Sequence, residues 1–244
     1  MADRCVVVTG VSKGLGESIA SDVLARGFDV IGVGRSASAR LASPSFRLVR
    51  VDLADSRALA SIVDSLFPSL ATRSLASIAV VNNAAVAGPV GTFGALSPGD
   101  IADSLTVNLV APTIIANAFV RAFRDASGDR RLINVSSGAA AHPIPGAGIY
   151  NVAKAGLEML TSALAAEHAQ SGLRVITIRP GVIDTPMQAF IRAQPAQRMP
   201  SHAMFQAFHD NGQLVPPDVT ASRIVDRLVI GAIDNGRTYN YAEL

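Results

Sequence analysis

Tryptophan is absent from this 244-residue chain, cysteine occurs once and lysine only twice. The single cysteine, Cys5, cannot form an intrachain disulfide, which excludes the disulfide-stapled scaffolds of small secreted proteins. With two lysines and a formal net charge of +2, the chain has no basic stripe of the kind that binds nucleic acid or an anionic membrane. We therefore predict neither as a partner.

Long apolar runs are missing as well. No stretch approaches the ~20 uninterrupted apolar residues of a membrane span. The chain enters an apolar strand and a glycine turn almost at once, which is unlike a secretory signal. These absences predict a cytoplasmic protein, and we predict no metal site.

What the chain has in abundance is apolar residues, 49% of the total, in alternating strand and helix patterns. Strands are predicted near 4–9, 28–34, 46–51, 77–81, 130–135, 173–179 and 237–241. Helices are predicted near 15–26, 55–67, 99–125 with a break near Pro112, 149–170 and 218–232. This alternation is typical of an α/β fold: a three-layer, doubly wound parallel sheet covered by helices on both faces, in a single domain over residues 1–244.

Residues 186–217 interrupt this alternation with five prolines and two short helical pieces. A segment this long between a strand and the last helix is typical of a lid over a substrate. Its predicted apolar inner surface comprises Met187, Phe190, Met204, Phe205 and Phe208. The alternative is that these side chains pack permanently into the core.

Tyr150, Lys154 and Ser137 form the first candidate constellation. Positions i and i+4 of a helix lie on one face, so the phenol of Tyr150 and the ammonium of Lys154 are expected to share one space. A nearby cation favours the phenolate and would lower the pKa of a tyrosine from its usual value of about 10. Such a tyrosine can donate and accept protons. The alternative is an ordinary helix with a surface lysine.

The other lysine lies in a glycine-rich turn. The strand over 4–9 runs into Thr9-Gly10-Val11-Ser12-Lys13-Gly14-Leu15-Gly16, and a helix follows. Glycines let the backbone approach a pyrophosphate, and the helix N-terminus supplies free N–H groups. The turn therefore predicts a dinucleotide-binding loop.

The carboxyl ends of the predicted strands gather the other candidates. In an open parallel sheet, ligands bind outside these ends. The residues that follow a strand end are Gly10, Gly34, Asp52, Asn82, Ser137 and Pro180, and we expect them to converge on one edge. Two alternatives stay open: Asp52 could cap the following helix, and Asn82-Asn83 could mark a turn.

Together these motifs resemble those of the short-chain dehydrogenase/reductase family. The shared motifs are Thr9-Gly10-x-x-x-Gly14-x-Gly16, Asn82-Asn83-Ala84, Asn108, Ser137, Tyr150-x-x-x-Lys154 and Pro180-Gly181, in the family's order and spacing over nearly the whole chain. The resemblance implies a Rossmann-type enzyme that uses NAD(H) or NADP(H) and transfers hydride to or from a carbonyl or alcohol carbon.

The resemblance also implies catalytic roles. Ser137 would hydrogen-bond the substrate carbonyl oxygen, Tyr150 would give that oxygen a proton, and Lys154 would contact the nicotinamide ribose and keep the pKa of Tyr150 low. Asn108 would hold a water that relays protons to Lys154, unless it satisfies backbone groups freed by Pro112. Ser136 is the weaker alternative to Ser137, because adjacent strand residues point to opposite faces.

For the cofactor, the resemblance places Asp52 and the Leu53 backbone at the adenine, and Asn82 and Ala84 on the ribose side. Residues 180–185 would wrap the nicotinamide, with Ile183 and Thr185 at its carboxamide. The whole predicted cofactor set is Gly10, Ser12, Lys13, Gly14, Leu15, Gly16, Gly34, Arg35, Ser36, Asp52, Leu53, Asn82, Ala84, Tyr150, Lys154, Pro180, Gly181, Ile183 and Thr185.

The tip of the second strand predicts which dinucleotide binds. An NAD site usually places Asp or Glu there, to bind the adenosine ribose hydroxyls. Here the strand runs into Gly34-Arg35-Ser36, which leaves room for a 2′-phosphate and offers a guanidinium to bind it. Lys13 supplies a second cation across the pocket. We predict NADP(H); the alternative is that both cations are solvated surface charges.

Two departures from the family pattern bear on subgroup and cofactor. Ala85 replaces the glycine of Asn-Asn-Ala-Gly, which matters only if residue 85 needs a positive φ. The C-terminal tail lacks the Asp-Gly-Gly ending of many tetrameric members. With residues 180–188 and 211–214, this tail resembles a subgroup that contains benzil reductases and sepiapterin reductases.

The predicted activity is the NADPH-dependent reduction of a diketone or similarly activated ketone. The alternatives are an NAD-dependent alcohol or sugar-alcohol dehydrogenase and, from another class, a non-catalytic dinucleotide-sensing regulator. The helix near 149–170 is rich in alanine, and in the family this helix and the one near 103–124 form a dimer interface. A homodimer or homotetramer is therefore expected, although alanines also suit a helix packed on a sheet.

Overall fold

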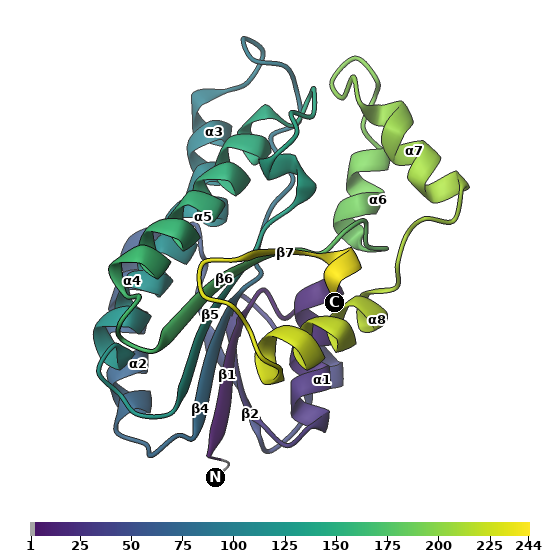
Figure 1. Ribbon diagram of the computed structural model, residues 1–244. Helices are drawn as coiled ribbons and strands as arrows, with labels where there is room; N and C mark the ends of the chain where they lie inside the picture. The colour runs from purple at the N-terminus through teal and green to yellow at the C-terminus, as the bar shows by residue number, and fades with distance from the viewer. Residues whose placement is uncertain (1–2) are drawn as a thin grey trace.

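The computed structural model describes residues 3–244; Met1 and Ala2, which belong to the predicted domain, lie outside the described residues. Seven parallel strands form one sheet in the order β3-β2-β1-β4-β5-β6-β7. They are β1 (Arg4–Thr9), β2 (Asp29–Gly34), β3 (Phe46–Arg50), β4 (Ser77–Asn82), β5 (Asp129–Val135), β6 (Leu173–Arg179) and β7 (Thr238–Asn240). The strand order reverses between β1 and β4, which confirms the doubly wound parallel sheet (Figure 1).

Helices cover both faces of this sheet (Figure 1). On one face lie α2 (Ser56–Ala71), α4 (Ala111–Phe123) and α5 (Gly148–Glu167), and on the other lie α1 (Gly14–Ala25) and α8 (Pro217–Ile224). Because side chains alternate along a strand, Val7 packs with the first group of helices, whereas Val6 and Val8 pack with the second. The apolar strands are thus buried on both faces, as a parallel sheet requires.

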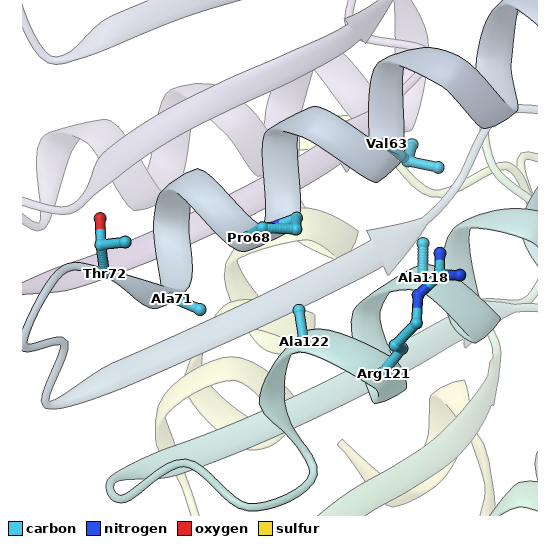
Figure 2. A pocket seen from close by; sticks show the side chains of 7 residues that line it. All are labelled: Val63, Pro68, Ala71, Thr72, Ala118, Arg121 and Ala122. Carbon is cyan, nitrogen blue, oxygen red and sulfur yellow. The ribbon is translucent and has the colours of Figure 1, made fainter.

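The helices α2 and α4 pack through aromatic rings on their inner side and border a surface groove on their outer side. The rings of Phe67 and Phe119 meet edge to face with centroids 5.6 Å apart. On the outer side, Pro68 of α2 and Ala122 of α4 border a surface groove, with Arg121 at its margin (Figure 2). This groove contains no residue of the predicted site.

The helix predicted near 99–125 departs from regular α-helical geometry just before Pro112. It consists of α3 (Pro98–Leu105), a π-helical segment (Thr106–Val110) and α4. Pro112 has no N–H to complete the hydrogen-bond ladder of this continuous helix, and the irregular segment ends at Val110, close to the predicted break. The last helix is similar, since α8 passes at Ile224 into a second π-helical segment, Val225–Ile230.

The continuous helical stretch Pro98–Phe123 is, by length and composition alone, apolar enough to cross a membrane. Its residues Ile115, Ala116 and Phe119 are instead buried in the core against the sheet and α2. This burial identifies the core helix of a folded domain.

The segment between β6 and α8 stands apart from the three layers. It contains α6 (Pro186–Arg192) and α7 (His202–Asp210), the two short helical pieces predicted within 186–217. Figure 1 shows both helices beyond the carboxyl ends of the strands, opposite α3 and the start of α5. They therefore overhang the edge at which the predicted site residues gather.

Candidate active site

The glycine turn between β1 and α1 has the backbone that its sequence predicts. Gly10 has a φ of +74°. A Cβ on Gly16 would lie 2.3 Å from Asn83 Nδ2 and 2.4 Å from the Gly10 carbonyl oxygen, so no larger residue fits. Thr9 Oγ1 accepts hydrogen bonds from the backbone N–H groups of Asn83 at 3.0 Å and Ala84 at 2.9 Å. The turn is thereby joined to the chain after β4, and α1 begins behind it with no side-chain cap on its N–H groups, which suits a bound pyrophosphate.

The loop after β6 closes on the same turn. Thr185 is the N-cap residue of α6, and its methyl carbon would lie 3.4 Å from a Cβ on Gly14. Within the loop, Gly181 has a φ of +77°, and Ile183 forms a β-bridge with Val215. The carboxyl ends of β1, β4 and β6 therefore meet, as the sequence predicts.

Tyr150, Lys154 and Ser137 come together beside this turn. The Lys154 side chain is buried, its Nζ donates a hydrogen bond to the Val135 carbonyl oxygen at 2.8 Å, and Nζ lies 5.5 Å from the centroid of the Tyr150 ring. Ser137 follows β5, and its side chain is hydrogen-bonded with the Tyr150 hydroxyl. The phenol of Tyr150, the ammonium of Lys154 and the hydroxyl of Ser137 thus lie close together between β5 and α5.

Burial dominates the ionisation of the Tyr150 and Lys154 side chains. It raises the pKa of Tyr150 from 10.0 to about 12, opposed by the hydrogen bond with Ser137. It lowers the pKa of Lys154 from 10.5 to about 8. The predicted lowering of the Tyr150 pKa is therefore wrong for this structure, because loss of water disfavours both charged forms more than proximity favours them. The raised pKa keeps the phenol protonated at neutral pH but makes it a weaker acid, so proton donation depends on neighbouring groups that stabilise the phenolate.

Asn108 lies in the π-helical segment and is 1% exposed. Its Nδ2 donates to the Val86 carbonyl oxygen at 2.9 Å and to Ser104 Oγ at 3.2 Å, and its Oδ1 accepts from the Val86 N–H at 2.8 Å. The side chain therefore holds the loop after β4. The alternative that it satisfies backbone groups freed by Pro112 is wrong, and the proton relay stays a prediction.

The Asn82 side chain points into the sheet rather than toward the edge. It is 4% exposed, and its Nδ2 donates to Asn134 Oδ1 at 2.9 Å. Asn134 continues this buried network to Thr161 Oγ1 at 2.8 Å. A contact between Asn82 and a dinucleotide would therefore use the backbone of Asn82.

The alanine that departs from the family pattern causes no strain. Among residues 3–244, every residue with a positive φ is glycine. Ala85 therefore has a backbone conformation open to any residue, and its methyl group needs no glycine in its place.

On the adenosine side, the tip of β2 is exposed. The Arg35 side chain is 78% exposed, and its Nη1 lies 3.6 Å from Asp52 Oδ2. Asp52 Oδ1 also accepts a hydrogen bond from the Ala54 N–H at 3.0 Å, whereas Asp55 caps α2. The alternative that Asp52 caps this helix is therefore wrong.

The other residues predicted on this side divide into exposed and buried ones. Ser12, Lys13 and Ser36 are exposed, and no side-chain hydrogen bond to the backbone is made by Lys13 as the N-cap of α1. Leu15, Gly34 and Leu53 are buried. The exposed polar atoms form a rim around the glycine turn, and the buried residues support it.

Sequence reasoning missed Arg50 and Asn151. Arg50 ends β3, pairs in register with Gly34, and donates from Nη1 to the Arg35 carbonyl oxygen at 2.7 Å. Asn151 donates to the His142 carbonyl oxygen at 2.9 Å and thereby holds the loop between β5 and α5. Strand register could have found Arg50, whereas the contacts of Asn151 leave no signal in the sequence.

The lid side chains only partly match the predicted inner surface. Phe205 and Tyr150 both pack against one apolar cluster, formed by Val90, Ala147 and the fully buried Met199. Of the other predicted residues, Met187 and Phe208 are half-buried, whereas Phe190 and Met204 are 46% and 40% exposed. Phe190 lines a cavity together with Val90, and the inner-surface role of Phe190 and Met204 stays a prediction; Met199 was missed.

Comparison with known proteins identifies the family to which this chain belongs. The family model described as short chain dehydrogenase matches residues 4–196. The chain belongs to the short-chain dehydrogenase family. Membership makes it an oxidoreductase that acts on CH–OH or C=O groups with NAD(P)(H), and the start of α1 behind the glycine turn, which has no side-chain cap, fits the phosphates of such a dinucleotide.

Relatives within the family share the whole length of the chain. Benzil reductase ((S)-benzoin forming) from Bacillus subtilis is 30% identical over 97% of this chain and 98% of its own. Sepiapterin reductase from Meriones unguiculatus is 28% identical over 94% of this chain and 93% of its own. Both names match the subgroup that the tail and the 180–188 segment resemble, which confirms that resemblance.

Solved short-chain dehydrogenases share the fold. The KRED1-Pglu enzyme superposes with a TM-score of 0.83 at 30% identity, covering 96% of this chain and 99% of that one. A putative NAD(P)-dependent gluconate 5-dehydrogenase from Beutenbergia cavernae, with bound NADP, superposes with a TM-score of 0.77 at 25% identity, covering 99% and 96%.

Proposed function

We propose that this protein reduces a diketone or similarly activated ketone to an alcohol, with NADPH as hydride source and Tyr150 as proton donor. The observation that carries the proposal is the placement of the Tyr150 phenol beside Ser137 and Lys154. The likeness to benzil reductase supports the substrate class. Bound NADPH would supply the hydride to the carbonyl carbon.

The proton balance follows from the side chains. Tyr150 donates its hydroxyl proton to the carbonyl oxygen, which becomes the alcohol oxygen. Ser137 hydrogen-bonds the same oxygen and holds it near the phenol. The ammonium of Lys154, 5.5 Å from the ring, stabilises the phenolate that remains. Each of these interactions is strongest in the transition state, where charge develops on oxygen.

Residues 186–217 act as the substrate lid in this proposal. Ile191, Met199 and Phe205 of this segment share one apolar cluster with Tyr150. Such a wall excludes water from the reacting oxygen and favours an apolar or aromatic substituent on the ketone. The apolar cluster therefore agrees with a substrate of the benzil type.

The choice of NADPH rests on charge at the β2 tip. Arg35 is exposed with no carboxylate on its own strand end, and Lys13 is exposed on the glycine turn. Arg50 adds a third cation beside the Arg35 backbone. The nearby Asp52 at 3.6 Å favours the alternative, an NAD-dependent alcohol or sugar-alcohol dehydrogenase, because it offsets part of the Arg35 charge. The three cations outnumber the single carboxylate of Asp52, so the net positive charge favours binding of the 2′-phosphate of NADPH.

Assembly and location complete the proposal. Val152 and Met159 on α5 and Val110 at the start of α4 are 52%, 68% and 40% exposed, which supports a homodimer or homotetramer built on these helices. We also propose a cytoplasmic protein, since Cys5 is a free thiol.

The test is oxidation of NADPH by the purified protein against diketones, quinones, pterins and keto-esters. We expect the fastest turnover with a diketone and an alcohol product identified by mass. Tyr239→Phe is the matched control for Tyr150→Phe, because it removes a phenol oxygen that instead accepts from the Asp234 N–H in the core. Turnover of none of these carbonyls would refute the proposal.

A further inference from the structure

A carboxylate one helical turn beyond Lys154 joins the three elements that carry the site. Glu158 lies on α5, and its Oε1 accepts a hydrogen bond from Ser136 Oγ at 2.8 Å. Arg179, the last residue of β6, donates to Glu158 Oε1 from Nε at 2.8 Å and to Oε2 from Nη2 at 2.7 Å. Both carboxylate oxygens are therefore engaged, in the bidentate geometry of strong Arg–carboxylate pairs.

The neighbours of these three residues are the reacting parts of the site. Ser136 directly precedes Ser137, and Arg179 directly precedes Pro180, the start of the loop predicted to wrap the nicotinamide. Ser136 Oγ also approaches the Lys154 carbonyl oxygen at 3.5 Å. The Glu158 carboxylate thus sets the spacing between the β5 end, the β6 end and the helix that carries tyrosine and lysine.

We propose that Glu158, with Arg179 and Ser136, is a positioning residue that holds Ser137 and the 180–185 loop in register with Tyr150. The inference rests on the proposed reaction, because its purpose is to align proton donor, carbonyl oxygen and hydride source. The pair is well shielded: the side chains of Arg179 and Glu158 are 25% and 18% exposed, which weakens screening by salt.

Glu158→Gln is the sharpest change. The amide oxygen of glutamine can still accept from Ser136, but its NH₂ group would face the Arg179 guanidinium, donor against donor. We expect kcat to fall roughly 10- to 100-fold, the scale of an ångström misplacement of reacting groups. The KM for the ketone should change much less, since Glu158 does not touch the lid cluster.

Asp29→Asn provides the matched control. Asp29 pairs with Arg73 at 2.6 Å, with side chains 18% and 22% exposed, at the start of β2 and therefore at the opposite edge of the sheet. Both variants replace a carboxylate by an amide in a similarly shielded ion pair. A merely structural role predicts similar losses of thermal stability and of kcat in the two variants, whereas positioning predicts loss of kcat only at Glu158.

Two readouts need no turnover, which separates this inference from the proposed reaction. In Glu158→Gln, the Kd for NADPH should rise several-fold, and backbone amides of 135–137 and 180–183 should exchange faster than in wild type. If wild type reduces no carbonyl, the proposed function fails while these readouts still decide the positioning role. An unchanged Kd and unchanged exchange would overturn it.

Ser136→Ala is the milder variant should Glu158→Gln not fold. It removes one hydroxyl and leaves the Arg179–Glu158 pair intact. We expect a several-fold lower kcat with nearly unchanged thermal stability. Wild-type kcat together with wild-type exchange at 135–137 would contradict the positioning role.

Discussion

The two halves of the candidate site, around Tyr150 and around the tip of β2, differ in burial. In the proposed reaction the first half transfers the proton and the second selects the cofactor. Around Tyr150, the Lys154 side chain is 2% exposed and the lid residue Met199 fully buried. Around the β2 tip, the Arg35 side chain is 78% exposed and its partner Asp52 is 49% exposed. The proposed proton-transfer groups are thus buried (Lys154) or half-buried (Tyr150), whereas the proposed phosphate-binding groups are exposed to water.

Because of this contrast in burial, we expect charged groups to have different effects in the two halves. In the buried half, dehydration shifts the pKa values of Tyr150 and Lys154 by about two units or more, to about 12 and about 8. In the exposed half, charges are screened, so affinity for a phosphate depends on how many cations surround it. Chemistry should therefore be lost by one substitution, whereas cofactor preference should change by degrees.

The largest effect is expected from Tyr150→Phe. Loss of the proton donor should reduce kcat by at least ~10²-fold, the usual scale of general acid catalysis. The Kd for NADPH should remain nearly unchanged, because the exposed half is intact. Steady-state kinetics with fluorescence titration of NADPH measure both. A variant that retains most of its turnover would show that Tyr150 is not the acid.

Arg35→Asp should move cofactor preference toward NADH. The substitution removes a charge-assisted contact and adds a repulsive one, so the NADPH/NADH ratio of kcat/KM should fall by at least ~10-fold, or about 1.4 kcal/mol. Arg124→Asp is the control, since that arginine is 60% exposed on the far end of α4. An unchanged ratio in the Arg35 variant would remove Arg35 from the phosphate site.

The pH dependence of turnover should report Lys154. Burial lowers its pKa to about 8, so its ammonium is present below that pH and is lost as pH rises through it. The rate of ketone reduction should fall over this range, because the neutral amine no longer stabilises the phenolate. Lys154→Ala should be slower throughout and lack this step. A flat wild-type profile up to pH 10 would contradict the assignment, since the unperturbed pKa is about 10.4.

The smallest effect concerns the lid. Residues 186–213 should exchange amide hydrogens faster than the sheet without ligand, and more slowly once NADPH and a ketone are bound. The expected change is modest, because Met199 and Phe205 already share a packed apolar cluster with Tyr150. Equal protection in both states would favour the alternative that these side chains are permanent core.

The fold was predictable because strands buried on both faces and a glycine turn leave local signals. β1 and the turn at Gly10 have the bounds expected from an apolar run and from positive φ. The π-helical segment was not predictable, because Asn108 bonds to Val86, 22 residues away. The sequence carried only a general helical signal there. Pro112 indicated a nearby break but not the π-helical geometry of the residues before it.

The candidate site divides in the same way. Ser137, Tyr150 and Lys154 follow from spacing, since a strand end and one helical turn bring them together. The direction of the Tyr150 pKa shift did not follow, because it depends on how deeply the folded chain buries the phenol. Glu158 and Arg179 also gave no signal, since their pairing depends on how α5 packs on β6.

The most direct test compares NADPH with NADH in the wild-type protein, using one diketone that the panel shows to be reduced. If the buried half transfers the proton and the exposed half selects the cofactor, the two cofactors should give similar kcat values, because the buried half is the same in both cases. It predicts a kcat/KM at least ~10-fold higher with NADPH, corresponding to about 1.4 kcal/mol from the exposed cations. Equal or better kcat/KM with NADH would contradict the account.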